Sequence, residues 1–139
     1  MNDRPIVLAS GSPRRRQLLE MLRIPFRVIA PDVDEHVLPG ERPDAYVTRL
    51  SRAKAQAVLP LAPGDVVLAA DTTVVLAGRI FEKPTSPAHA LEMLEQLQGK
   101  THEVLTAVAV AENGRLEQAL DVSRVTFRPK FGRPYRFTR

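Results

Sequence analysis

The chain contains no cysteine among its 139 residues. This absence excludes disulfide bonds, thiolate metal sites and cysteine nucleophiles. The sequence also lacks an apolar run of 18 residues and the apolar segment of a signal peptide, so we expect a cytoplasmic protein with no membrane partner. Hydrophobic residues make up 44% of the chain and charged residues 26%, which predicts a globular domain rather than a disordered chain.

A strong charge surplus is missing from most of the chain. The net charge is +4, but residues 128–139 hold five basic residues and no acidic one. The remainder has 15 basic and 16 acidic residues and is therefore close to neutral. A surface that binds the phosphate backbone of nucleic acid needs an excess of positive charge, which this part of the chain lacks. We therefore do not expect a nucleic-acid partner.

Several common catalytic patterns are also absent. The phosphate-binding sequence GxxxxGK does not occur, and no Ser-His-Asp arrangement can be identified. His36, His89 and His102 do not have the spacing of metal ligands, so we expect surface or structural roles for all three. The chemistry must be sought among acidic and basic side chains.

Apolar runs alternate with amphipathic segments, which predicts a mixed α/β fold with at least one antiparallel hairpin. The expected strands are Ile6–Ala9, Phe26–Ala30, Val66–Leu76, Ile80–Phe81, Val104–Ala111 and about Leu116–Phe127. The expected helices begin at Ser12-Pro13, near Pro43 and at Ser86-Pro87. Their expected core-facing residues are Leu18, Leu19 and Leu22, then Tyr46, Leu50, Ala53 and Ala57, then Ala90, Leu94 and Leu97. Tight turns are expected at Ala77-Gly78 and at Asn113-Gly114, with Gly99 ending the third helix.

Asp71 lies in the middle of the apolar run Val66–Leu76, which has the composition of a core strand. Burying an ionised carboxylate in such a place costs on the order of several kcal/mol of folding free energy unless a cation pairs with it. The chain offers Arg14-Arg15-Arg16, Lys54 and Lys83 as partners. An acid among spare cations indicates a site for a charged, metal-associated anion such as a nucleoside triphosphate.

The three arginines occupy the first turn of an expected helix, directly after the turn Ser10-Gly11-Ser12. Cations at this end of a helix oppose its dipole, so their clustering favours an anion bound between them. The alternative is a solvated basic patch. For Lys54, a stem lying along the core edge is the ordinary alternative. Asp32, Asp34 and Glu35 form a hard-oxygen cluster that would suit Mg²⁺ or Mn²⁺, although such acidic loops are usually solvated.

Five sequence strings together resemble the Maf family of nucleoside triphosphate pyrophosphatases. They are Leu8-Ala9-Ser10-Gly11-Ser12-Pro13-Arg14-Arg15, Tyr46-Val47-Thr48-Arg49-Leu50 with Lys54-Ala55, Ala70-Asp71-Thr72 with Val74-Val75, Glu82-Lys83-Pro84, and Gly99-Lys100-Thr101-His102 leading to Thr106. The resemblance covers about residues 5–128. It implies an elongated mixed β-sheet flanked by helices, as in Maf and ITPase-like proteins, with a nucleotide cleft.

The resemblance implies cleavage of dTTP or UTP to the monophosphate and pyrophosphate with Mg²⁺ or Mn²⁺, and a house-cleaning role against non-standard nucleotides. It places the catalytic acid-base at Asp71 and a metal-linked carboxylate at Glu35, with Asp71 also near the metal. The implied phosphate and nucleotide contacts are Ser10, Arg14, Arg15, Lys54, Thr72 and Lys83. Arg14 and Thr72 match the specificity positions of the dTTP/UTP branch. The resemblance leaves a homodimer open.

Two departures from the family pattern stand out. Gln98 replaces a serine, and the match stops near Arg128, where relatives continue with further strands. We therefore expect an incomplete domain at 1–128, a loosely packed basic tail at 129–139, and weak catalysis. The alternatives are a catalytically impaired nucleotide-binding remnant or regulatory protein, and a small nucleic-acid-binding protein.

Overall fold

One six-stranded mixed sheet organises the chain in the computed structural model, which describes residues 5–81 and 84–128. The strands are β1 (Ile6–Ala9), β2 (Phe26–Val28), β3 (Val66–Leu76), β4 (Arg79–Phe81), β5 (Thr101–Glu112) and β6 (Arg115–Thr126). Their order is β2-β1-β3-β5-β6, and β4 pairs with the far end of β3. β1 runs parallel to both β2 and β3, whereas β3, β5 and β6 form an antiparallel meander.

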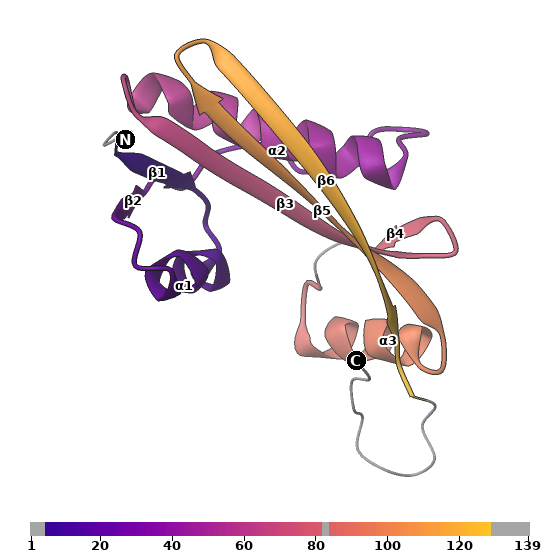
Figure 1. Ribbon diagram of the computed structural model, residues 1–139. Helices are drawn as coiled ribbons and strands as arrows, with labels where there is room; N and C mark the ends of the chain where they lie inside the picture. Colours follow the sequence, from indigo (N-terminus) through magenta and orange to yellow (C-terminus); the bar gives the residue numbers. More distant parts are fainter. Residues whose placement is uncertain (1–4, 82–83, 129–139) are drawn as a thin grey trace.

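The helices are α1 (Pro13–Met21), α2 (Pro43–Val58) and α3 (Pro87–Leu97), with a 3₁₀ turn at Leu59–Leu61. All three helices begin with a proline, as predicted, and the side chains of Ser12 and Ser86 cap α1 and α3. In Figure 1, α2 runs along one side of the long strands, and α1 and α3 lie on the other side near the two ends of the sheet.

Burial alternates along β3, so the strand has one covered face and one partly open face. The odd-numbered positions from Val67 to Val75 are buried, and Val67, Ala69 and Val75 belong to the clusters that contain the buried apolar residues of α2. The even-numbered positions are half-buried or exposed. Asp71 occupies one of the buried positions, so the sequence-based expectation of a carboxylate inside the core is confirmed.

Two expected core stripes differ from the structure. In α1 only Leu19 is buried, while Leu18 and Leu22 are 53% and 66% exposed because the described part of the chain places no element over them. In α2 Ala57 is exposed, and the buried stripe instead follows Tyr46, Val47, Leu50, Ser51, Lys54, Ala55 and Val58. These residues form two neighbouring rows with a spacing of four residues, and this face of the helix packs on strands β3 and β5.

Both predicted tight turns are present. Ala77 and Gly78 connect β3 to β4, and Asn113 and Gly114 connect β5 to β6, with positive φ angles of 51°, 79°, 47° and 76° respectively. Two successive positive φ angles match the right-handed twist of a hairpin, and asparagine and glycine adopt them at low cost. β5 begins at Thr101, three residues earlier than predicted, and β2 ends at Val28, two residues earlier.

The expected loosely packed tail at 129–139 lies outside the described residues. None of the helices in residues 5–81 and 84–128 has the length and hydropathy that crossing a bilayer requires.

Candidate active site

The order of the first three strands creates a crevice at the carboxyl end of β1. The chain passes from β1 through α1 to β2 on one side of β1, and then through α2 to β3 on the other side. In open α/β sheets, ligands bind at the carboxyl ends of strands where the chain direction reverses in this way. The turn after β1 contains Ser10, Gly11 and Ser12, and β3 continues past it to Asp71.

Asp71 is paired with a lysine of α2. The Nζ atom of Lys54 donates a hydrogen bond of 2.7 Å to Oδ1 of Asp71 and lies 3.4 Å from Oε1 of Glu35. Lys54 is 8% exposed and Asp71 is 5% exposed. The lysine therefore neutralises a buried carboxylate, which decides against the alternative of a stem lying along the core edge. The structure brings these three predicted site residues together.

Desolvation by burial raises the pKa of Asp71 above its ordinary value, and the hydrogen bond from Lys54 only partly opposes this effect. The charge of Lys54 also lowers the pKa, the neighbouring charge of Glu35 raises it, and Arg15 lowers it. A carboxylate with a raised pKa is a stronger base than an exposed one. This is the property that a general base requires.

A second pair joins α1 to β3. Nη2 of Arg15 donates a hydrogen bond of 2.8 Å to Oγ1 of Thr72, which lies 3.1 Å from Oγ1 of Thr106 on β5. Thr72 follows Asp71 directly, so its side chain projects from the opposite face of the strand. Arg15 and Thr72 were both predicted to belong to the site, and the structure places them in direct contact.

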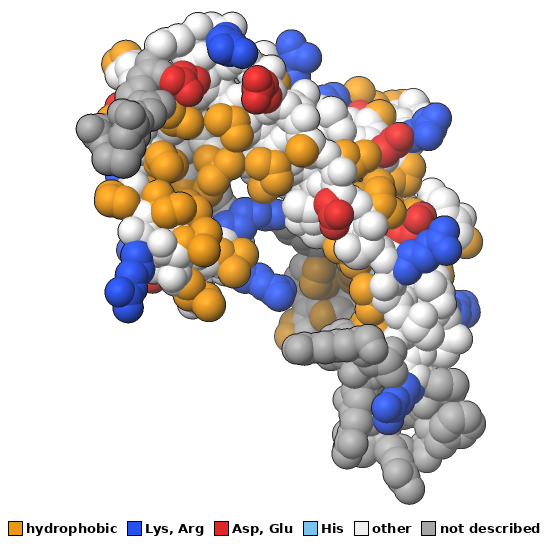
Figure 2. Space-filling view, viewed as in Figure 1, with side chains coloured by type: hydrophobic (Ala, Val, Ile, Leu, Met, Phe, Trp, Pro, Cys, Tyr) orange, Lys and Arg blue, Asp and Glu red, His pale blue; other side chains and the backbone are white. Residues whose placement is uncertain are grey.

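A cavity of about 390 Å³ lies beside Asp71. It is lined by Val33, Asp34, Glu35, His36, Tyr46, Asp71, Thr72, Thr73 and Phe81. Figure 2 shows that the surface is hollowed between the α1 end and the α3 end of the molecule, with Lys or Arg side chains at the rim. The volume is in the range of small-molecule sites.

The other predicted site residues vary in position. Ser10 is buried, and its Oγ atom accepts a hydrogen bond of 2.9 Å from the backbone N–H of Ser12, which shapes the turn after β1. Arg14 is exposed on the first turn of α1. Lys83 lies outside the described residues, so its expected place among the cations near Asp71 is not tested.

The acidic residues of the loop after β2 do not act as one cluster. Asp34 is exposed and interacts with His36, and the pKa of Asp34 is lowered chiefly by that side-chain hydrogen bond. Within residues 5–81 and 84–128, no group of three acidic or histidine side chains could hold a metal ion alone. Glu35 and Asp71 nevertheless share one cation, the Lys54 ammonium group. Two carboxylates suit Mg²⁺ or Mn²⁺, because these ions take further oxygen ligands from water and phosphate.

The sequence analysis assigned no role in the site to several residues that surround it. Tyr46 and Arg49 donate hydrogen bonds to the backbone carbonyl groups of Glu35 and His36, and Thr106 contacts Thr72. All three belong to strings that resemble the Maf family, but only their contacts in the folded chain indicate what they do.

Comparison with known proteins adds to this geometry. The family model described as "Maf-like protein" matches residues 5–131. The dTTP/UTP pyrophosphatase of Pectobacterium atrosepticum is 50% identical over 125 residues, which are 89% of this chain and 64% of that protein. The enzyme of the same name from Myxococcus xanthus is 52% identical over 124 residues, 88% of this chain and 62% of that protein. The chain therefore spans just under two thirds of the length of these relatives.

Two solved structures share the fold. The HAM1 protein of Coxiella burnetii aligns with a TM-score of 0.54 at 21% identity, over 89% of this chain and 73% of that protein. The Ham1 protein of Staphylococcus aureus aligns with a TM-score of 0.57 at 16% identity, over 89% of this chain and 72% of that protein. These alignments confirm the predicted mixed α/β sheet flanked by helices.

Proposed function

Because this chain belongs to the Maf family, we propose that it hydrolyses nucleoside triphosphates, dTTP and UTP above all, to the monophosphate and pyrophosphate. The observation that carries the proposal is the buried pair of Asp71 and Lys54 at the carboxyl end of the parallel strands, with Glu35 beside it. The names of the relatives supply the substrate class. We further propose that the protein acts in the cytoplasm, where its substrates are found.

In this proposal Asp71 is the general base. Lys54 holds its Oδ1 atom, which leaves Oδ2 to accept a proton from the attacking water. The burial that raises the pKa of Asp71 gives the carboxylate the basicity for this step, while the cation keeps it ionised near neutral pH. Proton transfer by a positioned group of this kind contributes roughly 10²- to 10⁴-fold to the rate.

The basic side chains bind the phosphates and stabilise the charge that develops on the leaving pyrophosphate. Lys54 and Arg15 lie on either side of β3 beside Asp71 and Thr72. We assign phosphate or nucleotide contacts also to Ser10, Arg14, Thr72 and Lys83. Arg14 and Thr72 are the proposed specificity positions.

Glu35 and Asp71 are the residues that would hold Mg²⁺ or Mn²⁺ in this site. The bound ion would neutralise charge on the phosphates and orient them. The Lys54 ammonium group pairs with both of these carboxylates and so holds them close to each other.

The test is a comparison of nucleotides at one concentration, with Mg²⁺ and with EDTA, in which released pyrophosphate is measured. We expect kcat/KM for dTTP and UTP to exceed that for dGTP and ATP by at least about tenfold, roughly what one hydrogen bond contributes to binding. Equal rates for all nucleotides would refute the specificity, and no pyrophosphate from any of them would refute the function.

The acid side of the pH profile provides a second test. Because only ionised Asp71 can accept a proton, and its folded pKa lies above the ordinary value, we expect kcat/KM to fall at a pH above about 4, the range of an exposed aspartate. Lys54→Met removes an interaction that lowers this pKa, so the acid limb of its residual activity should lie at a higher pH than that of the wild type. The pH dependence of kcat/KM on dTTP for both proteins checks this order, and an acid limb that does not move would contradict it.

A further inference from the structure

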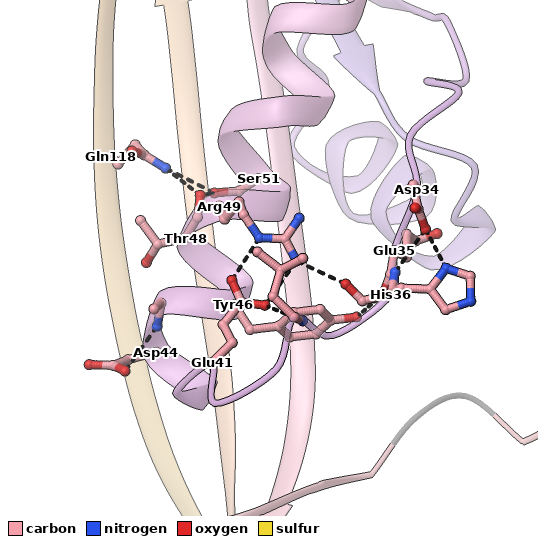
Figure 3. A network of polar contacts seen from close by, with 12 residues as sticks. Asp34, Glu35, His36, Glu41, Asp44, Tyr46, Thr48, Arg49, Ser51 and Gln118 are labelled. Carbon is pink, nitrogen blue, oxygen red and sulfur yellow. Dashed lines mark hydrogen bonds and ion pairs between the residues drawn. The ribbon is translucent and has the colours of Figure 1, made fainter.

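Glu35 lies on a long segment without regular secondary structure, between β2 and α2. Its side chain is 42% exposed, yet its Oε1 atom is 3.4 Å from Lys54. A side chain on such a segment keeps its place only if the backbone is held elsewhere. The contacts that hold this backbone come from the first two turns of α2 (Figure 3).

Two side chains of α2 bind successive backbone carbonyl groups of the segment. The Oη atom of Tyr46 donates a hydrogen bond of 2.6 Å to the carbonyl oxygen of Glu35. Nη2 of Arg49 donates a hydrogen bond of 2.9 Å to the carbonyl oxygen of His36. Figure 3 shows both side chains extending from the helix to these two peptide units.

Arg49 is itself fixed by Glu41. Its Nε and Nη2 atoms donate hydrogen bonds of 2.7 Å and 2.9 Å to the two carboxylate oxygens, the bidentate geometry that is specific to arginine. Oε1 of Glu41 also accepts a hydrogen bond from the N–H of Leu38. The Glu41 side chain is only 8% exposed, and its pKa is lowered chiefly by the Arg49 hydrogen bonds.

The ring of Tyr46 completes the arrangement. It is buried, and the Arg49 guanidinium group lies 5.7 Å from the ring centre. Tyr46, Arg49 and Lys54 follow one another along α2, so a single helix carries the lysine of the site and the two residues that hold the segment of Glu35.

We propose that Tyr46, Arg49 and Glu41 form a clamp that positions the Glu35 carboxylate against Lys54 and Asp71. The clamp residues are positioning residues, because they act through the backbone carbonyl groups of Glu35 and His36. The expected effect of the clamp on turnover rests on the proposed function, whereas its effect on the backbone of the segment that carries Glu35 does not. Displacements of about 1 Å in such supporting groups can change rates by about 100-fold.

The test uses Tyr46→Phe, which removes one hydroxyl group and keeps the buried ring, and Arg49→Lys, which keeps the charge and loses the bidentate geometry. Arg52→Lys is the matched control, since Arg52 is exposed on the same helix. Amide hydrogen exchange at residues 35–38 is measured for all proteins. We expect it to be about fivefold faster in the first two variants, from the worth of one hydrogen bond, and unchanged in the control.

A double-mutant cycle with Glu35→Gln then asks whether the clamp acts through Glu35. Tyr46→Phe alone should lower kcat/KM by about tenfold, and the same change in the Glu35→Gln protein should have less than about a twofold effect, because coupled residues are not additive. Unchanged exchange in both clamp variants, or fully additive losses in kcat/KM, would overturn the clamp. A wild-type protein that cleaves no nucleotide would refute the proposed function, and the exchange rates alone would then decide the clamp.

Discussion

The Asp71→Asn variant is expected to lose turnover of dTTP by about a thousandfold while it keeps the fold, because the amide cannot accept a proton from water. The asparagine side chain has nearly the same size, and its carbonyl oxygen can still accept the hydrogen bond that Lys54 donates to Oδ1. The KM for dTTP should change much less than kcat. Steady-state kinetics with circular dichroism on the same samples measures both effects.

Asp44→Asn is a matched control for this change. Asp44 lies in the first turn of α2, pairs with Arg42 and is not one of the residues assigned to the site or to the clamp. We expect wild-type kinetics from this variant. If Asp71→Asn retained turnover within about threefold of wild type, Asp71 would not be the general base.

The Lys54→Met variant is expected to lose both activity and stability. Methionine fills the apolar path of the lysine stem, but it leaves Asp71 buried without its hydrogen-bond donor. Removing one partner of a buried ion pair costs roughly 3 kcal/mol or more in the free energy of unfolding. Turnover of dTTP should fall by at least about 100-fold, because phosphate stabilisation is lost together with the position of the base.

The stability loss has a defined pH dependence. In the variant, the folded pKa of Asp71 rises further above its unfolded value, so the ionised carboxylate opposes folding at pH values above the folded pKa. The deficit relative to wild type should therefore shrink as the pH falls through that pKa. Urea unfolding at several pH values measures it, with Lys100→Met as an exposed control. An equal deficit at all pH values would show that the loss comes from packing alone.

Several features of the fold follow from local patterns in the sequence. The run around Asp71 predicted a core strand with a buried charge, and Asn113-Gly114 predicted the hairpin between β5 and β6. These signals are local, because they depend on composition and on turn conformations that few residues adopt.

Other features depend on contacts between distant parts of the chain. The pattern of leucines in α1 gave no indication that Leu18 and Leu22 would be exposed, since periodicity does not show what covers a helix face. Only the folded chain shows that Lys54 is hydrogen-bonded to Asp71, seventeen residues away, and that Arg15 is hydrogen-bonded to Thr72. The contact between Glu41 and Arg49 could not be predicted from the sequence either, because an acidic residue in a loop and an arginine on a helix have no distinctive spacing.

The most direct test of the central claim is a ³¹P NMR spectrum of the wild-type protein with dTTP and Mg²⁺, recorded as the reaction proceeds. If Asp71, Lys54 and Glu35 form a nucleoside triphosphate pyrophosphatase site, the triphosphate signals will be replaced by those of dTMP and pyrophosphate. The appearance of dTDP with inorganic phosphate, or a triphosphate spectrum that does not change with folded protein present, would contradict it.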